Sequence, residues 1–239
     1  MDGVINLYKP TGVSSARHAY RLRPIVGTRK VGHAGALDPF ADGVLVVAIG
    51  RATKLIERLM GLPKLYRTTL RLGVTNATFD PEQPFEPVPV DTAPTPQLVA
   101  EAVGRFVGSI GQVPPPFSAV KVGGRPAYKM AARGEHVRLA PRKVRVYDIN
   151  LLRYDYPDLD LEVRCGRGTY IRSLARDIGS ALGTAACCQT LTRLAVGPFR
   201  LDLSVRLDQT DPSLVRGKVI GLEETSRLLA AAEAAEPRS

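Results

Sequence analysis

The chain has 239 residues, 44% of them hydrophobic, so it can bury a substantial core as one large domain or as a domain with a small appendage. Its formal net charge of +10 and pI near 9.8 fit a polyanionic partner such as RNA. It opens with no charged and apolar leader, and no apolar run approaches the roughly 20 residues of a bilayer-spanning helix, so we expect a cytoplasmic protein without membrane contact.

The charge is uneven along the chain. Residues 1–75 hold 12 Lys and Arg against 4 Asp and Glu, whereas residues 76–100 hold none against 4. The three cysteines, Cys165, Cys187 and Cys188, form neither an even set nor a C-x-x-C pair, and the three histidines are scattered. We therefore expect no disulfide framework and no metal site. We also expect a monomer.

In the first third of the chain, hydrophobic periodicity and caps predict alternating strands and helices. They are a strand at Val4–Tyr8, a helix from a Ser14 or Ser15 cap to Arg23, a strand at Val44–Ile49, a helix at Thr53–Met60 and a strand at Leu65–Leu72. Pro24 is expected to end the first helix. The last strand alternates apolar and basic positions, which predicts a half-buried strand with a basic outer side.

The rest of the chain begins with an acidic, proline-rich connection over residues 75–96. The elements predicted beyond it are a helix from Pro96 to about Val107 capped by Thr95, a strand at Val120–Val122, a helix at Ala127–Arg133, strands at Val144–Tyr154 and Leu159–Cys165, a helix at Tyr170–Leu182 capped by Thr169, and a helical stretch at Leu222–Glu236. Strands and helices follow no regular βαβ repeat, which predicts an α+β fold with a mixed, largely antiparallel sheet.

One carboxylate, Asp38, lies in a glycine-lined loop just before the buried strand, in GHAGALDPFADGVLVVAIGRATKL. Glycines let the backbone turn tightly or approach a ligand, and Pro39 biases Asp38 away from a helix. Such a position suits a catalytic carboxylate. It also suits an Asx turn with only a structural purpose.

This stretch resembles the catalytic motif of the TruB family of tRNA pseudouridine synthases. Five further blocks resemble family motifs in the same order, over residues 3 to about 200. They are INLYKPTGVSS, KLYRTTLRLG, QVPPPFSAVKVGGRPAYKMAARG, RCGRGTYIRSLARDIG and TLTRLAVGPF. The resemblance implies the pseudouridine synthase fold, no cofactor, and isomerisation of the T-loop uridine, position 55 of tRNA, recognised through the folded T-arm.

By the same resemblance, three residues are catalytic. Asp38 is the nucleophile or proton-handling carboxylate, Arg172 pairs with the catalytic aspartate, and Tyr66 stacks on the target base and takes its C5 proton. From the residues alone, Arg172 could equally be an exposed helix arginine and Tyr66 a half-buried strand tyrosine.

Five residues are expected to bind substrate by resemblance: His33, Leu191, Tyr170, Lys9 and Lys64. His33 would fill the space left by a flipped-out nucleotide, and Leu191 would line the uracil pocket. Alone, His33 would be a structural loop residue and Leu191 core. The cations are candidates for phosphate contact or for support of the site, and the same holds for Arg51, Lys54, Arg67 and Arg193.

The resemblance predicts a catalytic domain at residues 1–205 and a C-terminal extension at 206–239 that is helical and then disordered. This extension is too short for the PUA-type domain of many family members, so we expect the core to bind most of the RNA. Ala34 replaces a usual threonine and Ala77 a common acidic residue. Either change could alter loop stability or substrate preference.

Two other functional classes stay open. The chain could be a non-catalytic RNA-binding or RNA-folding protein on the same fold, which would leave the set Asp38, Tyr66 and Arg172 unexplained. It could also be a pseudouridine synthase for another RNA. A protein-interaction module is least favoured, because it would not need this set.

Overall fold

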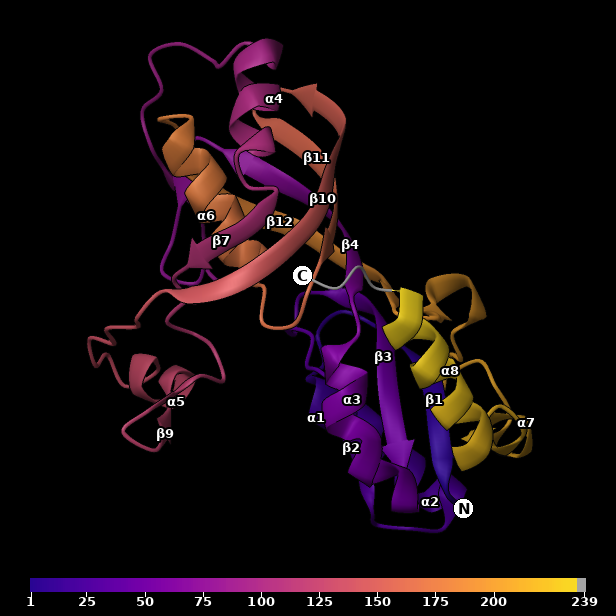
Figure 1. The fold of residues 1–239 in the computed structure, drawn as a ribbon. Helices are drawn as coiled ribbons and strands as arrows, with labels where there is room; N and C mark the ends of the chain where they lie inside the picture. Colours follow the sequence, from indigo (N-terminus) through magenta and orange to yellow (C-terminus); the bar gives the residue numbers. More distant parts are fainter. Residues whose placement is uncertain (236–239) are drawn as a thin grey trace. The chain divides into compact units, whose positions relative to one another are not determined.

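The computed structural model describes residues 1–235, which form two compact units (Figure 1). Unit 1 is Met1–Tyr66 together with the chain from Thr192 onward, and unit 2 is Arg67–Leu191. Two strands, β4 (Lys64–Leu72) and β12 (Ala186–Val196), have residues in both units. Unit 2 is therefore one continuous segment inserted between two segments of unit 1.

Unit 1 contains a sheet with the strand order β14-β1-β3-β12, to which β2 and β13 add short pairs. Apart from the parts of β4 and β12 that belong to unit 1, the elements of this unit are β1 (Gly3–Lys9), α1 (Ser15–Tyr20), α2 (Leu22–Val26), β2 (Val31–His33), β3 (Asp42–Ile49), the 3-10 helices η1 (Gly50–Leu55) and η2 (Leu201–Leu203), α3 (Ile56–Gly61), β13 (Phe199–Arg200), α7 (Pro212–Gly217), β14 (Ile220–Gly221) and α8 (Leu222–Ala235). Strands β1 and β3 pair antiparallel from Gly3 opposite Ile49 to Lys9 opposite Gly43. Strand β12 joins β3 in parallel.

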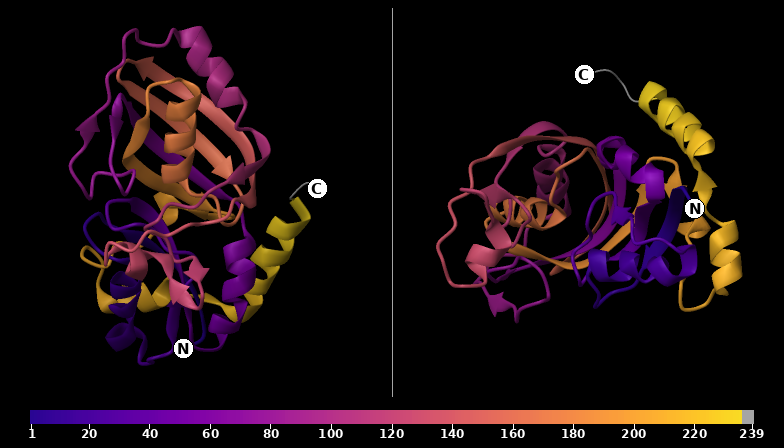
Figure 2. Two further views of the ribbon diagram at one scale, coloured as in Figure 1. Left: turned by 90° about the vertical axis from the view of Figure 1, so that its left-hand side faces the viewer. Right: turned by 90° about the horizontal axis from the view of Figure 1, so that it is seen from below.

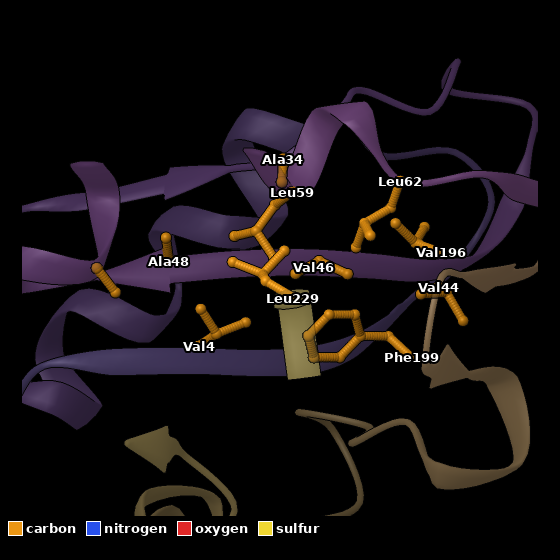
Figure 3. Packing of buried hydrophobic residues seen from close by; sticks show 11 residues of the cluster. Val4, Ala34, Val44, Val46, Ala48, Leu59, Leu62, Val196, Phe199 and Leu229 are labelled. Atoms are coloured by element: carbon orange, nitrogen blue, oxygen red, sulfur yellow. The ribbon is translucent and has the colours of Figure 1, made fainter. Parts of the chain in front are cut away.

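The core of unit 1 lies on both faces of this sheet. On one face, Val46 of β3 lies under Leu59 of α3 and Leu229 of α8 (Figure 3). Leu59 is fully buried and Leu229 is 1% exposed, and burial of a leucine side chain stabilises a fold by about 1.5–3 kcal/mol. Ala34, the departure noted in the sequence, is fully buried in the same cluster.

The first predicted helix differs from expectation, because Pro24 does not end it. The helix breaks at Arg21, and Pro24 lies in the first turn of α2. A proline is tolerated there because the first-turn N–H groups have no partner within the helix. The second helix ends instead at Gly27, whose φ of 67° is left-handed.

Unit 2 contains a sheet with the order β12-β4-β11-β10-β7. Its other elements are β5 (Val74–Thr75), β6 (Glu86–Pro87), α4 (Pro96–Gly104), β7 (Gly108–Gln112), β8 (Lys121–Val122), β9 (Arg125–Pro126), α5 (Ala127–Ala131), β10 (Arg142–Asp155), β11 (Asp158–Cys165) and α6 (Ile171–Ala181). Strands β7, β10 and β11 pair antiparallel. Both views of Figure 2 show α6 against the concave face of this curved sheet.

Two predictions for unit 2 helices need correction. The helix after Thr95 ends at Gly104, three residues before Val107. Thr169 does not cap α6: the N-cap is Tyr170, and the Thr169 hydroxyl donates to the carbonyl of Gly166 at 3.1 Å. The α+β class and the mixed, largely antiparallel sheet are confirmed.

Helix α8 accounts for most of the predicted Leu222–Glu236 stretch. Glu236 and the tail expected to be disordered, residues 237–239, lie outside the described residues. None of the helices in residues 1–235 combines the length and apolar character that crossing a bilayer requires.

Candidate functional site

Asp38 lies in unit 1 in the connection between β2 and β3, residues 34–41, which we call the Asp38 loop. The loop leaves β2 where the Ala34 N–H donates to the Val46 carbonyl at 2.8 Å. Directly before Asp38, the Ser15 hydroxyl of α1 donates to the Leu37 carbonyl at 3.0 Å and accepts from the Leu37 N–H at 2.8 Å. Both backbone groups of the residue preceding Asp38 are therefore held by one buried serine.

Lys9 fixes the residue on the other side of Asp38. Its ammonium group donates to the carbonyls of Pro10 and Val13 at 2.9 Å and of Pro39 at 3.3 Å. The Pro39 carbonyl also accepts from the Gly12 N–H at 2.8 Å. Lys9 is fully buried, so its ammonium group binds backbone carbonyls of two loops, the one that follows β1 and the Asp38 loop. Of the two roles left open for this lysine, the burial suits support of the site and leaves no surface for a phosphate.

Arg193 of β12 holds the first half of the Asp38 loop. Its guanidinium donates to the carbonyls of Val44 at 2.7 Å, Gly35 at 3.0 Å and Ala36 at 3.4 Å. The arginine is 1% exposed, so it too supports the site and is not available to a phosphate. Three side chains from three elements thus hold the backbone around Asp38 in one conformation. The Asp38 side chain itself is half-buried.

His33 ends β2 immediately before the Asp38 loop, where it pairs with Val47 of β3. Burial and the nearby positive charge of Arg193 lower the pKa of this histidine below its usual value, so it is neutral at physiological pH. Its Nδ1 atom is buried and has no hydrogen-bond partner within residues 1–235.

Lys64 and Tyr66 lie on the first residues of β4. The Lys64 ammonium donates to the carbonyls of Leu62 at 2.6 Å and Met60, and the residue is 6% exposed. Like Lys9, it suits support rather than phosphate contact. Tyr66 is 8% exposed and is the last residue of the first segment of unit 1.

In unit 2, Arg172 is a buried residue in the first turn of α6, not an exposed helix arginine. It pairs with Asp80 at 3.1 Å, and the two side chains are 3% and 2% exposed. Its guanidinium also donates to the carbonyls of Thr78 and Phe117, both at 2.9 Å. A buried charge requires such partners, because an unpaired one would be strongly destabilising.

Asp80 was not identified from the sequence, which shows only an acidic, proline-rich connection there. In the structure Asn76, Thr78 and Asp80 are all buried, and the Asn76 amide donates to the Asp80 carbonyl at 2.7 Å. The signal that could have revealed them is the spacing of three polar residues at every second position around Phe79. Ala77, the second departure, is exposed in this segment.

Tyr170 is the N-cap residue of α6 and half-buried. The side-chain amide of Gln112 accepts from the Tyr170 N–H at 2.8 Å and donates to its carbonyl at 3.1 Å. Gln112 therefore holds the residue directly before the helix, and it was not identified from the sequence either. Leu191 is 7% exposed on β12 and is the last residue of unit 2.

The remaining cationic candidates are exposed. Arg67 pairs with Glu162 and Arg51 with Asp2. Lys54 is exposed on η1. Among the predicted residues, then, Lys9, His33, Asp38 and Arg193 gather around one loop of unit 1, and Tyr170 and Arg172 begin one helix of unit 2.

Comparison with known proteins identifies the family. The profile described as TruB family pseudouridylate synthase (N terminal domain) matches residues 23–171. The chain is 46% identical over 210 residues to a tRNA pseudouridine synthase B from Mycobacterium sp. (strain KMS), covering 86% of this chain and 71% of the relative. The chain belongs to the TruB family.

A second TruB relative, the tRNA pseudouridine synthase B of Clostridium acetobutylicum, is 38% identical over 224 residues, which cover 94% of this chain and 77% of the relative. Among solved structures, a chain in the crystal structure of a Cbf5-Nop10-Gar1 complex matches with a TM-score of 0.72 and 28% identity. That match covers 95% of this chain and 62% of the other, so this chain spans about three fifths of its length. The TruB profile includes His33, Asp38 and Tyr66 and stops one residue before Arg172.

Proposed function

We propose that this protein is a tRNA pseudouridine synthase that isomerises uridine 55 in the T loop of tRNA to pseudouridine. The observation that carries the proposal is the Asp38 loop, in a chain that is 46% identical to a tRNA pseudouridine synthase B. A carboxylate held by Ser15, Lys9 and Arg193 through its neighbouring backbone is pre-organised, as a catalytic group needs to be. An Asx turn with only a local structural role would not require three buried side chains to hold the backbone on both sides of it.

The reaction exchanges one bond of the uracil for another. The bond between C1′ of the ribose and N1 of the base breaks, the uracil turns, C5 forms the new bond to C1′, and the C5 proton leaves while N1 gains a proton. The sugar carbon is electron-poor after the first step, and a carboxylate can trap or stabilise it. We propose Asp38 for this role and, by resemblance, Arg172 as the cation that pairs with the catalytic carboxylate.

The other proposed roles concern the base. Tyr66 would stack on the uracil and accept the C5 proton, and Leu191 would line the uracil pocket. Reaching a T-loop uridine requires flipping it out, at a cost of a few kcal/mol. A neutral His33 suits stacking in the vacated space, because it adds no charge to a desolvated site. Tyr170 stays a proposed substrate contact, and we propose that Lys9 and Lys64 act by supporting the site.

RNA binding is proposed to use exposed cations of both units. In unit 2, the segment 121–145 carries eight exposed ones: Lys121, Arg125, Lys129, Arg133, Arg138, Arg142, Lys143 and Arg145. Such a surface suits the phosphate backbone of RNA. We further propose that residues 1–205 form the catalytic domain and that the protein acts as a monomer in the cytoplasm, where its tRNA substrate is found.

The deciding experiment is a comparison of wild type with Asp38→Asn on tRNA labelled with tritium at C5 of uridine. Wild type should release one tritium per tRNA, with pseudouridine mapped to position 55. Asp38→Asn should release none and should bind tRNA within a few-fold of wild type, because the amide keeps the size and loses the nucleophilicity. Asp91→Asn, an exposed aspartate of unit 2, is the matched control and should stay fully active.

Two outcomes would contradict the proposal. Turnover by a verified Asp38→Asn sample would remove Asp38 from the chemistry. A wild type that binds tRNA without releasing tritium would favour the non-catalytic RNA-binding alternative, and pseudouridine found only in another RNA would favour a different substrate.

A further inference from the structure

Helix α1 exposes a cluster of arginine and tyrosine side chains that the proposed chemistry does not use. Ser15, His18 and Ala19 form the buried face of this helix. Arg17, Tyr20 and Arg21 are exposed, and their spacing of i, i+3 and i+4 places them on one side of a helix.

Arg23, in the first turn of α2, joins this cluster. Its guanidinium carbon lies 3.6 Å from the centre of the Tyr20 ring, and Tyr20 is 44% exposed. The stacked pair therefore presents a planar cation on an aromatic ring near solvent. We call Arg17, Tyr20, Arg21 and Arg23 the α1 face.

The α1 face is strongly positive. Residues 15–30 contain five Lys and Arg and no Asp or Glu. Arg21 pairs with Asp208, whereas neither Arg17 nor Arg23 has a carboxylate partner in the part of the chain that the structure describes. A helix side with unneutralised arginines suits a polyanion, and arginine binds phosphate with two parallel hydrogen bonds.

The buried face of α1 connects this surface to the candidate catalytic residue. Ser15 holds both backbone groups of Leu37, the residue before Asp38. The His18 Nε2 atom donates to the Tyr8 carbonyl at 2.9 Å, next to Lys9. The α1 face is therefore held in a fixed position relative to the Asp38 loop within unit 1.

We propose that the α1 face binds backbone phosphates of the RNA helix that flanks the target nucleotide. The inference rests on the proposed function, because that function supplies an RNA with a nucleotide at Asp38. Arg17 and Arg23 are the two cations of this face that have no carboxylate partner among the described residues. Arg17 and the Arg23–Tyr20 stack can contact two phosphates of one strand, while Arg21 stays paired with Asp208.

The test measures tRNA binding as a function of salt for wild type and for Arg17→Gln/Arg23→Gln. Loss of two phosphate contacts should weaken binding at least about tenfold near 0.1 M salt and should lower the slope of log K against log salt by about 2, since each neutralised phosphate contributes roughly 0.9. The rate of tritium release at saturating tRNA should stay within twofold of wild type. The control is Arg200→Gln/Arg227→Gln, which removes the same charge from exposed positions elsewhere in unit 1.

The outcomes separate this inference from the function on which it rests. If the double variant had the same tRNA affinity and the same slope of log K against log salt as the control variant, the proposal for the α1 face would be wrong. Weaker tRNA binding with an unchanged slope would also contradict it. A wild type that forms no pseudouridine in the same buffer would instead contradict the proposed function. If the double variant melts at a lower temperature than the control, the single variant Arg17→Gln is used to test the proposal, because this exposed side chain can be replaced without touching the core. Arg17→Gln should lower the slope of log K against log salt by about 1. Displacement of wild type from RNA by polyglutamate at equal charge concentration would show an unspecific anion surface and would also overturn the proposal.

Discussion

Gly43 is the residue at which the surroundings of the Asp38 loop leave no room for a side chain. Its φ is +108°, and an added Cβ would lie 2.3 Å from the carbonyl oxygen and 2.7 Å from the nitrogen of Arg193. Strain in this backbone region costs about 1–2 kcal/mol and overpacking another 1–3 kcal/mol. We expect Gly43→Ala to lower the free energy of unfolding in urea by about 3 kcal/mol. The control Gly61→Ala, in a helix with nothing within 4 Å of the new atom, should be neutral or stabilising.

Two histidines, the buried His18 and the half-buried His33, make the stability of the protein depend on pH. Burial is the main cause that lowers the pKa of both His18 and His33 from 6.5 in the folded state. The unfolded chain therefore binds protons at a higher pH than the folded one, so stability is complete above about pH 6.5 and is lost as pH falls through the lowered pKa values. We expect the free energy of unfolding to fall between pH 7.5 and pH 5. In His18→Gln/His33→Gln this fall should be smaller, and an identical pH dependence would contradict the assignment.

The character of single residues was the hardest property to predict. Lys9, Arg172 and Arg193 look like surface cations in the sequence, yet each is at most 3% exposed. Their burial depends on carbonyls and carboxylates from distant segments, such as Asp80 for Arg172. Local patterns contain no information about such partners, so the positions of these cations followed only from the resemblance and their contacts only from the structure.

At the level of elements, α6 depends on a side chain from a different element. Gln112 is 1% exposed, and its amide holds both the N–H and the carbonyl of Tyr170 at the start of the helix. Its removal leaves the part-buried N–H of Tyr170 without this partner, which costs up to about 1–3 kcal/mol. We expect Gln112→Ala to lower the free energy of unfolding by this amount and to speed hydrogen exchange in the first turn of α6. The exposed Gln97→Ala should change neither quantity.

Elements with a clear period were predictable, and their ends were less so. The apolar run at Val44–Ile49 and the alternation at Leu65–Leu72 correspond to β3 and β4 within two residues. The end of the first helix was wrong because a proline in a first turn has the same local sequence as one that stops a helix. The cap of α6 was wrong because the Thr169 hydroxyl donates to the Gly166 carbonyl, while Tyr170 is held by Gln112, 58 residues away.

For the whole molecule, the C-terminal helix is part of the core of unit 1. Leu229 of α8 is 1% exposed and packs with residues of β1, β3 and α3 (Figure 3). We expect Leu229→Ala to lower the free energy of unfolding by about 2–5 kcal/mol, the usual range for a buried leucine. Leu203→Ala removes the same atoms from a side chain that is 68% exposed and should change stability by less than about 0.5 kcal/mol. Equal effects would show that α8 does not contribute to this core.

The discontinuity of unit 1 has a consequence for the order of events on the ribosome. Domains generally fold as units during synthesis, and unit 2 is complete once residue 191 has emerged. Unit 1 is not, because the parallel partner of β3 and the side chain of Arg193 come from the segment after it. The backbone around Asp38 is therefore synthesised early, but Arg193, the last of the three side chains that hold it, is synthesised only late in translation. A nascent chain that stalls between the two segments would contain every residue of the Asp38 loop, but the loop would not yet be held in its final conformation.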